Sequence, residues 1–118
     1  MKLENEIKRY STLNGYPISN FDQLVCSCGE SKFKLFSDDE EGGACGVCIA
    51  CGTEYDVENS VSYIESRQQN ICNCDNEILE LGVGRALYRE GPDVCWVYVG
   101  AECKKCGLAG VYVDWKEA

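Results

Sequence analysis

The sequence predicts a small, mainly β protein in which a short helical arm precedes two three-stranded units. Three observations support this fold class. The chain has only 118 residues but carries ten cysteines. Most of these cysteines follow one order that occurs twice, a CxC step and then a CxxCG step, within residues 26–52 and 72–107. Between and after these steps, apolar and polar residues alternate, which is typical of strands.

The arm comprises residues 1–25. Leu3, Ile7 and Tyr10 recur with the spacing of one helical face, and residues 14–17 form an Asn-Gly-Tyr-Pro turn signal. Residues 18–25 are expected to form a second short helix. We expect the arm to cover an open edge of the sheet; the alternative is that it docks on a partner.

The first unit comprises residues 26–58. Phe33 and Leu35 alternate with lysines and predict a strand. The acidic run from Asp38 to Glu41, which two glycines follow, predicts a solvated hairpin loop. Residues 44–47 are expected to return as a second strand, and residues 53–57 to form a third.

The second unit comprises residues 72–118 and follows a linker at residues 59–71, for which the pattern favours neither strand nor helix. Residues 79–83 alternate and predict a strand. Glu90 to Asp93 predict a turn, and residues 94–99 are rich in β-branched and aromatic side chains, which favours another strand. Val111, Val113 and Trp115 are expected on one face of a last strand.

Eight cysteines are candidate metal ligands because paired thiolates on tight turns converge on one ion. The chain has no histidine, so each site must be all-cysteine. The expected ligands are Cys26, Cys28, Cys48 and Cys51 for site one and Cys72, Cys74, Cys103 and Cys106 for site two. Four thiolates suit Zn²⁺, so we expect two zinc ions in closed, structural sites.

Metal is favoured over disulfides by the expected cellular compartment. Residues 1–6 show no signal-peptide pattern, and no apolar run approaches the length of a membrane span. We therefore expect a cytoplasmic protein, whose thiols stay reduced. The alternative is a secreted domain in which the cysteines form disulfides.

The order of cysteine pairs and strands resembles the zinc-ribbon superfamily over residues 26–58 and 72–115. The resemblance implies a three-stranded sheet clamped by two knuckles in each unit; the first knuckle departs from the family because it is CxC, where CxxC is commoner. The two similar units suggest a tandem duplication. The ending Asp114-Trp115-Lys116 is similar to that of a group of uncharacterised small bacterial zinc-ribbon-like proteins. The CxC and CxxC of site two also resemble the zinc site of the redox-regulated bacterial holdase chaperone.

Several residues outside the two sites have alternative interpretations. Cys45 and Cys95 are expected to be small buried core residues; alternatively, Cys45 is a reactive thiol beside a metal. Lys104 and Lys105 are expected on a solvated turn, where they offset the charge of site two; alternatively, they form a basic contact with Arg85 and Arg89. Trp96 and Tyr98, together with Trp115 and Tyr112, are expected to build the core between the two units.

The composition favours a binding module over an enzyme. The formal net charge is −9, which repels a phosphate backbone and suits a partner with a basic surface. No nucleophile–base set or phosphate-binding loop is visible, so no enzymatic activity is expected. The first hypothesis is an acidic module that binds another protein, as an inhibitor or immunity protein binds a basic toxin or nuclease. The alternatives are a zinc ribbon associated with nucleic acid or the transcription machinery, and a redox-sensing zinc–thiolate switch.

Overall fold

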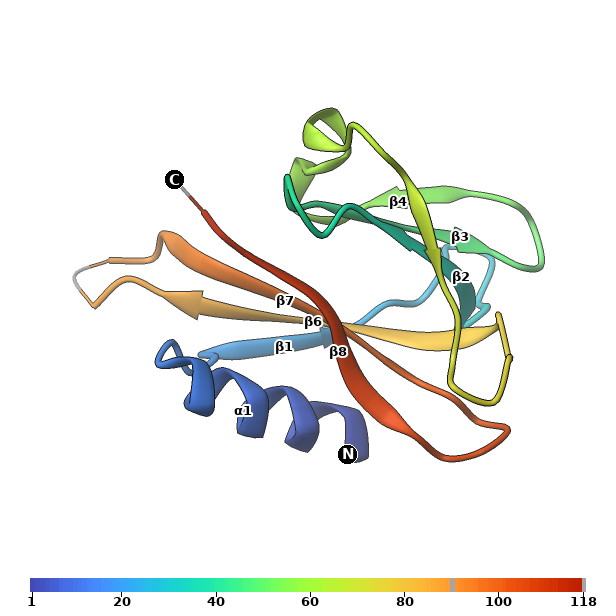
Figure 1. The fold of residues 1–118 in the computed structure, drawn as a ribbon, viewed down its shortest axis with the longest axis horizontal. Helices are drawn as coiled ribbons and strands as arrows, with labels where there is room; N and C mark the ends of the chain where they lie inside the picture. The colour runs from blue at the N-terminus through green and yellow to red at the C-terminus, as the bar shows by residue number, and fades with distance from the viewer. Residues whose placement is uncertain (90, 118) are drawn as a thin grey trace.

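The computed structural model describes residues 1–89 and 91–117 and confirms the mainly β fold class with an N-terminal helix (Figure 1). The elements in chain order are α1 (Lys2–Asn14), β1 (Asn20–Gln23), β2 (Lys32–Ser37), β3 (Ala44–Cys48), β4 (Glu54–Asp56), the 3₁₀ turns η1 (Val57–Asn59) and η2 (Val61–Tyr63), β5 (Gln68–Asn70), β6 (Leu79–Leu87), β7 (Val94–Glu102) and β8 (Ala109–Lys116). Glu90, the first residue of the predicted turn before β7, lies outside the described residues.

Helix α1 forms as its periodicity predicts and buries one face against the sheet. Leu3 and Ile7 are fully buried on that face, and Ser11 follows one turn later. The helix ends at Gly15, whose φ of 88° is the left-handed conformation that glycine adopts at little cost. Among the described residues, no helix combines the length and the apolar character that a membrane span requires.

The second predicted helix of the arm, over residues 18–25, is wrong, because residues 20–23 form β1. This strand pairs antiparallel with β6, and Phe21 lies opposite Gly84. The Phe21 ring also lies against Gly82, where a Cβ atom would come within 2.6 Å of it. A helix of this length is only marginally stable by itself. Pairing with the free edge of β6 instead gives the backbone of these residues hydrogen-bond partners. The expectation that the arm covers a sheet edge is confirmed for β1, while α1 covers a sheet face.

The two cysteine units join in one sheet with the strand order β4-β3-β2-β6-β7-β8, and β1 and β5 lie off this path, paired with the central strands β6 and β2. The junction is short: Lys32 and Phe33 of β2 pair with Glu80 and Leu79 of β6. Farther along, β2 pairs with β5 and β6 pairs with β1. In Figure 1, β2 to β4 lie above β6 to β8, and α1 lies on the opposite side.

Two hydrophobic cores result from this arrangement. The larger core lies between the units and includes Phe33 and Leu35 of β2, Leu81 of β6, and Val97 and Val99 of β7. The smaller core lies beneath α1 and contains Leu3, Ile7, Ala86, Cys95 and Tyr98.

The prediction that Trp96 and Tyr98 build the core between the units is therefore wrong. Side chains alternate along β7, so Tyr98 is buried beneath the helix while its neighbours Val97 and Val99 face the first unit. Trp96 packs against the same helix-side core. Tyr112 and Trp115 do pack against the core between the units.

A bulge in β8 also corrects the prediction for the last strand. Val99 pairs with Val113, but the next residue, Gly100, pairs with Val111, so Tyr112 is an extra residue. The extra residue breaks the alternation and places Val111 on the helix side, whereas Val113 and Trp115 face the core between the units.

The acidic loop between β2 and β3 is solvated at Asp39, Glu40 and Glu41, but the prediction is wrong for Asp38, which is 5 % exposed. One Asp38 carboxylate oxygen accepts the backbone N–H groups of Glu40 and Glu41, at 3.1 and 3.2 Å. The other oxygen accepts those of Glu65 and Ser66, at 3.0 and 3.1 Å. Asp38 thus ties the segment that leads to the second unit to the first unit.

We predict that Asp38→Asn lowers the thermal stability at neutral pH by several degrees. The four N–H donors, with that of Ser66 first, hold the pKa of Asp38 below its usual range. A carboxylate whose pKa is lowered by folding stabilises the fold above its unfolded pKa, and that contribution is lost as the pH falls through the folded pKa. Thermal melts at pH 7 test this prediction, with Asp39→Asn as the exposed neighbouring control. Equal melting temperatures for the two variants would contradict it.

Candidate metal centres

The structure brings the eight predicted cysteines together in two groups of four. Within each group, all four Sγ atoms lie within 4.8 Å of one another. The closest pairs are 3.5 Å (Cys26–Cys51) and 3.7 Å (Cys28–Cys48) in site one, and 3.4 Å (Cys72–Cys106) and 3.6 Å (Cys74–Cys103) in site two.

These distances fit a tetrahedral metal site better than disulfides. A tetrahedral ion with bonds of about 2.3 Å places its sulfur ligands about 3.8 Å apart. A disulfide requires a separation of about 2.05 Å, and all ten cysteines are free. Two four-sulfur clusters able to hold metal ions are therefore present, while ligation itself and the choice of Zn²⁺ stay predictions.

The CxC turn has the same backbone geometry at both sites. The N–H of Cys26 donates to Glu30 O, and the N–H of Cys72 donates to Asn76 O, at 2.8 and 3.0 Å. The residue after the second cysteine has a positive φ in each turn, 94° at Gly29 and 70° at Asp75. A glycine takes this conformation readily, and an aspartate tolerates it better than most residues.

The CxxCG turn also repeats. The N–H of Gly52 donates to Cys48 O at 2.9 Å, and that of Gly107 donates to Cys103 O at 2.8 Å. Both glycines have a positive φ, 77° and 82°. The turn folds the backbone beneath the sulfurs, so the two cysteines of each step face the same point. The positive φ of the turn thus favours glycine at the position after the CxxC step.

Hydrogen bonds from neighbouring groups stabilise the charged form of at least one sulfur in each site. At site one, the backbone N–H of Cys28 and then the Tyr55 hydroxyl, 3.3 Å away, lower the pKa of Cys26 to about 6. At site two, the Asn76 side-chain amide, also 3.3 Å away, is the largest of several donors that lower the pKa of Cys103 to about 6. Thiolates are the form in which cysteine binds a metal.

Tyr55 and Asn76 were not identified from the sequence as part of the sites. Asn76 lies two residues after the CxC step, and its side-chain amide also closes the local turn through Ile78. Tyr55 lies in β4, and only the fold of the sheet brings its hydroxyl to Cys26. This group also accepts the Ser27 N–H at 2.8 Å.

Two of the residues suggested as a basic contact point, Lys104 and Arg85, are paired with carboxylates. Lys104 lies 3.0 Å from Glu102 and 3.6 Å from Glu80. Arg85, a suggested member of a basic contact, instead pairs with Asp22 and Glu58 at 2.9 and 2.5 Å. The interpretation of Lys104 with Arg85 as a basic contact point is therefore wrong, because acidic neighbours neutralise both side chains.

The remaining cysteines are buried, as predicted. Cys45 is inaccessible to solvent, and Cys95 is 6 % exposed beneath the helix. Neither belongs to a four-sulfur cluster. Burial raises the pKa of Cys45 to about 11, and its Sγ lies 3.4 Å from a Glu54 oxygen. A protonated, inaccessible thiol is a poor nucleophile, which argues against a reactive Cys45.

We predict that Tyr55→Phe weakens metal binding at site one by roughly tenfold and leaves site two unchanged. The substitution removes the hydroxyl that donates to Cys26 but keeps the ring, which packs edge-on against Phe33 at 5.8 Å. Groups that hydrogen-bond to metal ligands typically contribute about 10- to 100-fold in affinity. Competition with a chromophoric chelator measures each site, and Tyr63→Phe, at an exposed tyrosine, is the control. An unchanged affinity at site one would contradict the prediction.

Comparison with family models, with curated proteins and with solved structures found no match to this chain. The geometry of the chain shows a mainly β domain with two four-cysteine clusters suited to metal binding.

Proposed function

We propose that this chain is a cytoplasmic zinc-binding module that docks on a protein partner with a basic surface and has no enzymatic activity of its own. The observation that carries the proposal is the closure of both clusters. Four sulfurs fill the coordination shell of a tetrahedral ion, so neither site offers a position for water or substrate. Such sites support folding, and the function then depends on the surface.

The acidic loop supports a basic partner. A hollow of about 290 Å³ beside it is lined by carboxylate residues, including Asp39, Glu40, Glu41 and Glu65. These side chains add to a chain whose formal net charge is −9. A surface of this kind attracts a positive patch and increases the rate of association, particularly at low salt. The same charge disfavours direct contact with DNA or RNA.

Charge reversal on the loop tests the proposal. The variant with Asp39→Lys, Glu40→Lys and Glu41→Lys keeps Asp38 and its structural hydrogen bonds. Proteins captured by the wild-type chain are identified, and their binding is measured with purified components across a salt series. We expect basic partners whose affinity falls with salt and is lost with the variant. Glu4→Lys, on the helix, is the control, and partners that bind all three chains equally would refute the proposal.

A second candidate function is a redox switch, which the exposure of three cluster cysteines favours. Cys28, Cys51 and Cys106 are solvent-exposed, so an oxidant can reach each cluster. Native mass spectrometry before and after mild peroxide distinguishes the two functions. Two metals that survive peroxide support the docking module, whereas loss of both metals with disulfides within the pairs supports the switch.

A further inference from the structure

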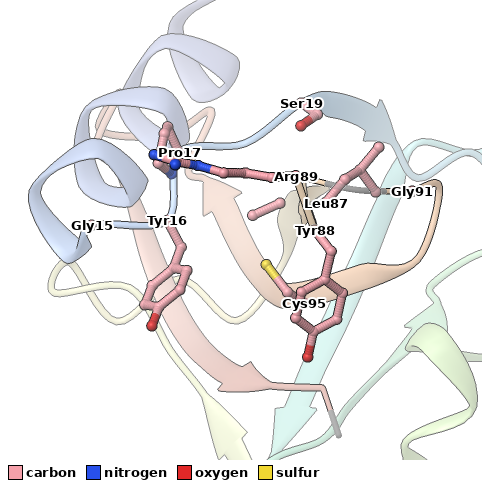
Figure 2. A pocket seen from close by; sticks show the side chains of 10 residues that line it. Gly15, Tyr16, Pro17, Ser19, Leu87, Tyr88, Arg89, Gly91 and Cys95 are labelled. Carbon is pink, nitrogen blue, oxygen red and sulfur yellow. The ribbon is translucent and has the colours of Figure 1, made fainter.

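A cavity of about 900 Å³ lies between the turn that follows α1 and the β6–β7 hairpin, and none of the cluster cysteines lines it. Figure 2 shows the side chains that line it. Its volume is within the range of small-molecule sites. The Cys95 sulfur points into the cavity, and Ala86, which is 2 % exposed, also belongs to its lining.

Two tyrosine rings form walls of the cavity, and one of them is held rigidly. Tyr16 stacks on Trp96 with ring centroids 4.7 Å apart and an interplanar angle of 15°. Its carbonyl oxygen also accepts the Tyr98 hydroxyl at 2.8 Å. Tyr88 comes from the hairpin, and both rings remain partly exposed, at 44 % and 46 %. The preformed wall at Tyr16 favours a flat apolar ligand because little side-chain freedom is lost there on binding.

The described lining of the cavity carries a charge opposite to that of the chain. Arg89 is the charged residue of the described lining, which contains no acidic side chain. In Figure 2 its side chain extends across the cavity toward Pro17. Among the described residues, Arg9, Arg67 and Arg85 each form an ion pair with a carboxylate, and Arg89 does not. A guanidinium can bind a carboxylate through two parallel hydrogen bonds.

We propose that this cavity binds a small aromatic carboxylate, with its ring between Tyr16 and Tyr88 and its carboxylate on Arg89. The apolar lining favours a ring, and Arg89, which forms no ion pair with any of the described residues, favours an anionic group. A net charge of −9 opposes the approach of an anion, so recognition depends on this local cation. The proposal does not depend on the docking function or on the redox alternative.

The test compares 1-naphthoate with its neutral analogue 1-naphthamide on the metal-loaded full chain, using amide chemical shifts in titrations. We expect saturable shifts centred on Tyr16, Ala86 and Cys95, with the carboxylate bound about tenfold more tightly than the amide. The stacked pair of Tyr16 and Trp96 provides a second signal in tryptophan fluorescence.

Two variants make the result specific. Arg89→Gln should abolish the preference for the carboxylate, and Tyr88→Ala should weaken both probes. Arg9→Gln, at an exposed arginine on α1, should change neither. Binding of the two probes with equal affinity, shifts confined to other residues, or the absence of saturable shifts up to the solubility limit would each overturn the proposal.

Discussion

Removing the metal from this chain is expected to unfold both units together. Structural zinc sites of small domains supply on the order of 10–16 kcal/mol of apparent binding free energy at neutral pH. A domain of this size has a total free energy of unfolding of about 5–15 kcal/mol, so the apo chain should not stay folded. The buried cluster cysteines Cys26, Cys48, Cys72 and Cys103 all belong to the hydrophobic core between the units. Loss of either ion therefore removes support from a core that both units share.

A single ligand substitution measures this coupling. Cys48→Ser removes one ligand from site one and leaves all four sulfurs of site two. We expect native mass spectrometry to show loss of both metals, and amide spectra to lose their dispersion in both units. Cys45→Ala is the matched control, because Cys45 is buried in the same strand but lies outside both clusters.

Two outcomes would contradict this expectation. If the Cys48→Ser chain retains the metal of site two and the dispersed amide signals of residues 72–117, the units fold independently. If Cys45→Ala loses metal as Cys48→Ser does, Cys45 acts as a ligand and the assignment of site one is wrong.

Phe33→Ala is expected to lower the free energy of unfolding by about 3–5 kcal/mol, the usual cost of deleting a buried aromatic ring. Phe33 is inaccessible to solvent and lies at the junction between the units. Its backbone pairs with the cluster cysteine Cys48 on one side and with Leu79 of β6 on the other. Its ring packs against Tyr55, whose hydroxyl donates to Cys26. The cavity left by the substitution therefore borders both units.

Because folding and metal binding are coupled, the affinity of both sites should fall. Denaturant unfolding of the metal-loaded chain and chelator competition measure the two effects. Phe36→Ala is the matched control, since Phe36 lies in the same strand but faces the other side, where it packs against the guanidinium of Arg67. An equal loss of stability for Phe33→Ala and Phe36→Ala, or a loss of affinity at site one alone, would argue against a shared core.

The strands and the clustering of cysteines could be predicted because both depend on local patterns. Alternation over residues 32–37 indicates a strand with one face toward a core. Residues 94–99 are rich in β-branched and aromatic side chains, which favour a strand without regard to its partners. The CxC and CxxCG steps set turns of a few residues, and the two pairs in each unit can meet when the strands between them form a hairpin. The helix over residues 2–14 follows from the spacing of Leu3 and Ile7 in the same way.

The misassignments occur where a distant segment supplies the partner. Residues 20–23 form a strand because β6 offers a free edge, and nothing in those four residues indicates that edge. Asp38 resembles its acidic neighbours in sequence, yet the backbone of residues 65 and 66 reaches its carboxylate and buries it. The bulge at Tyr112 is set by pairing with β7. The alternation in β8 therefore predicts the wrong face for Val111.

The sequence alone therefore determined the mainly β class, the helical start and the eight cysteines that come together, because each depends on residues close in the chain. The tertiary structure decided how the two units are joined, which core each face of β7 borders, and where the cavity of Arg89 and Cys95 lies. These features depend on which strand edges meet, and the short junction of Lys32 and Phe33 with Glu80 and Leu79 is specified by the packing of the whole chain. Local periodicity carries no information about such pairings.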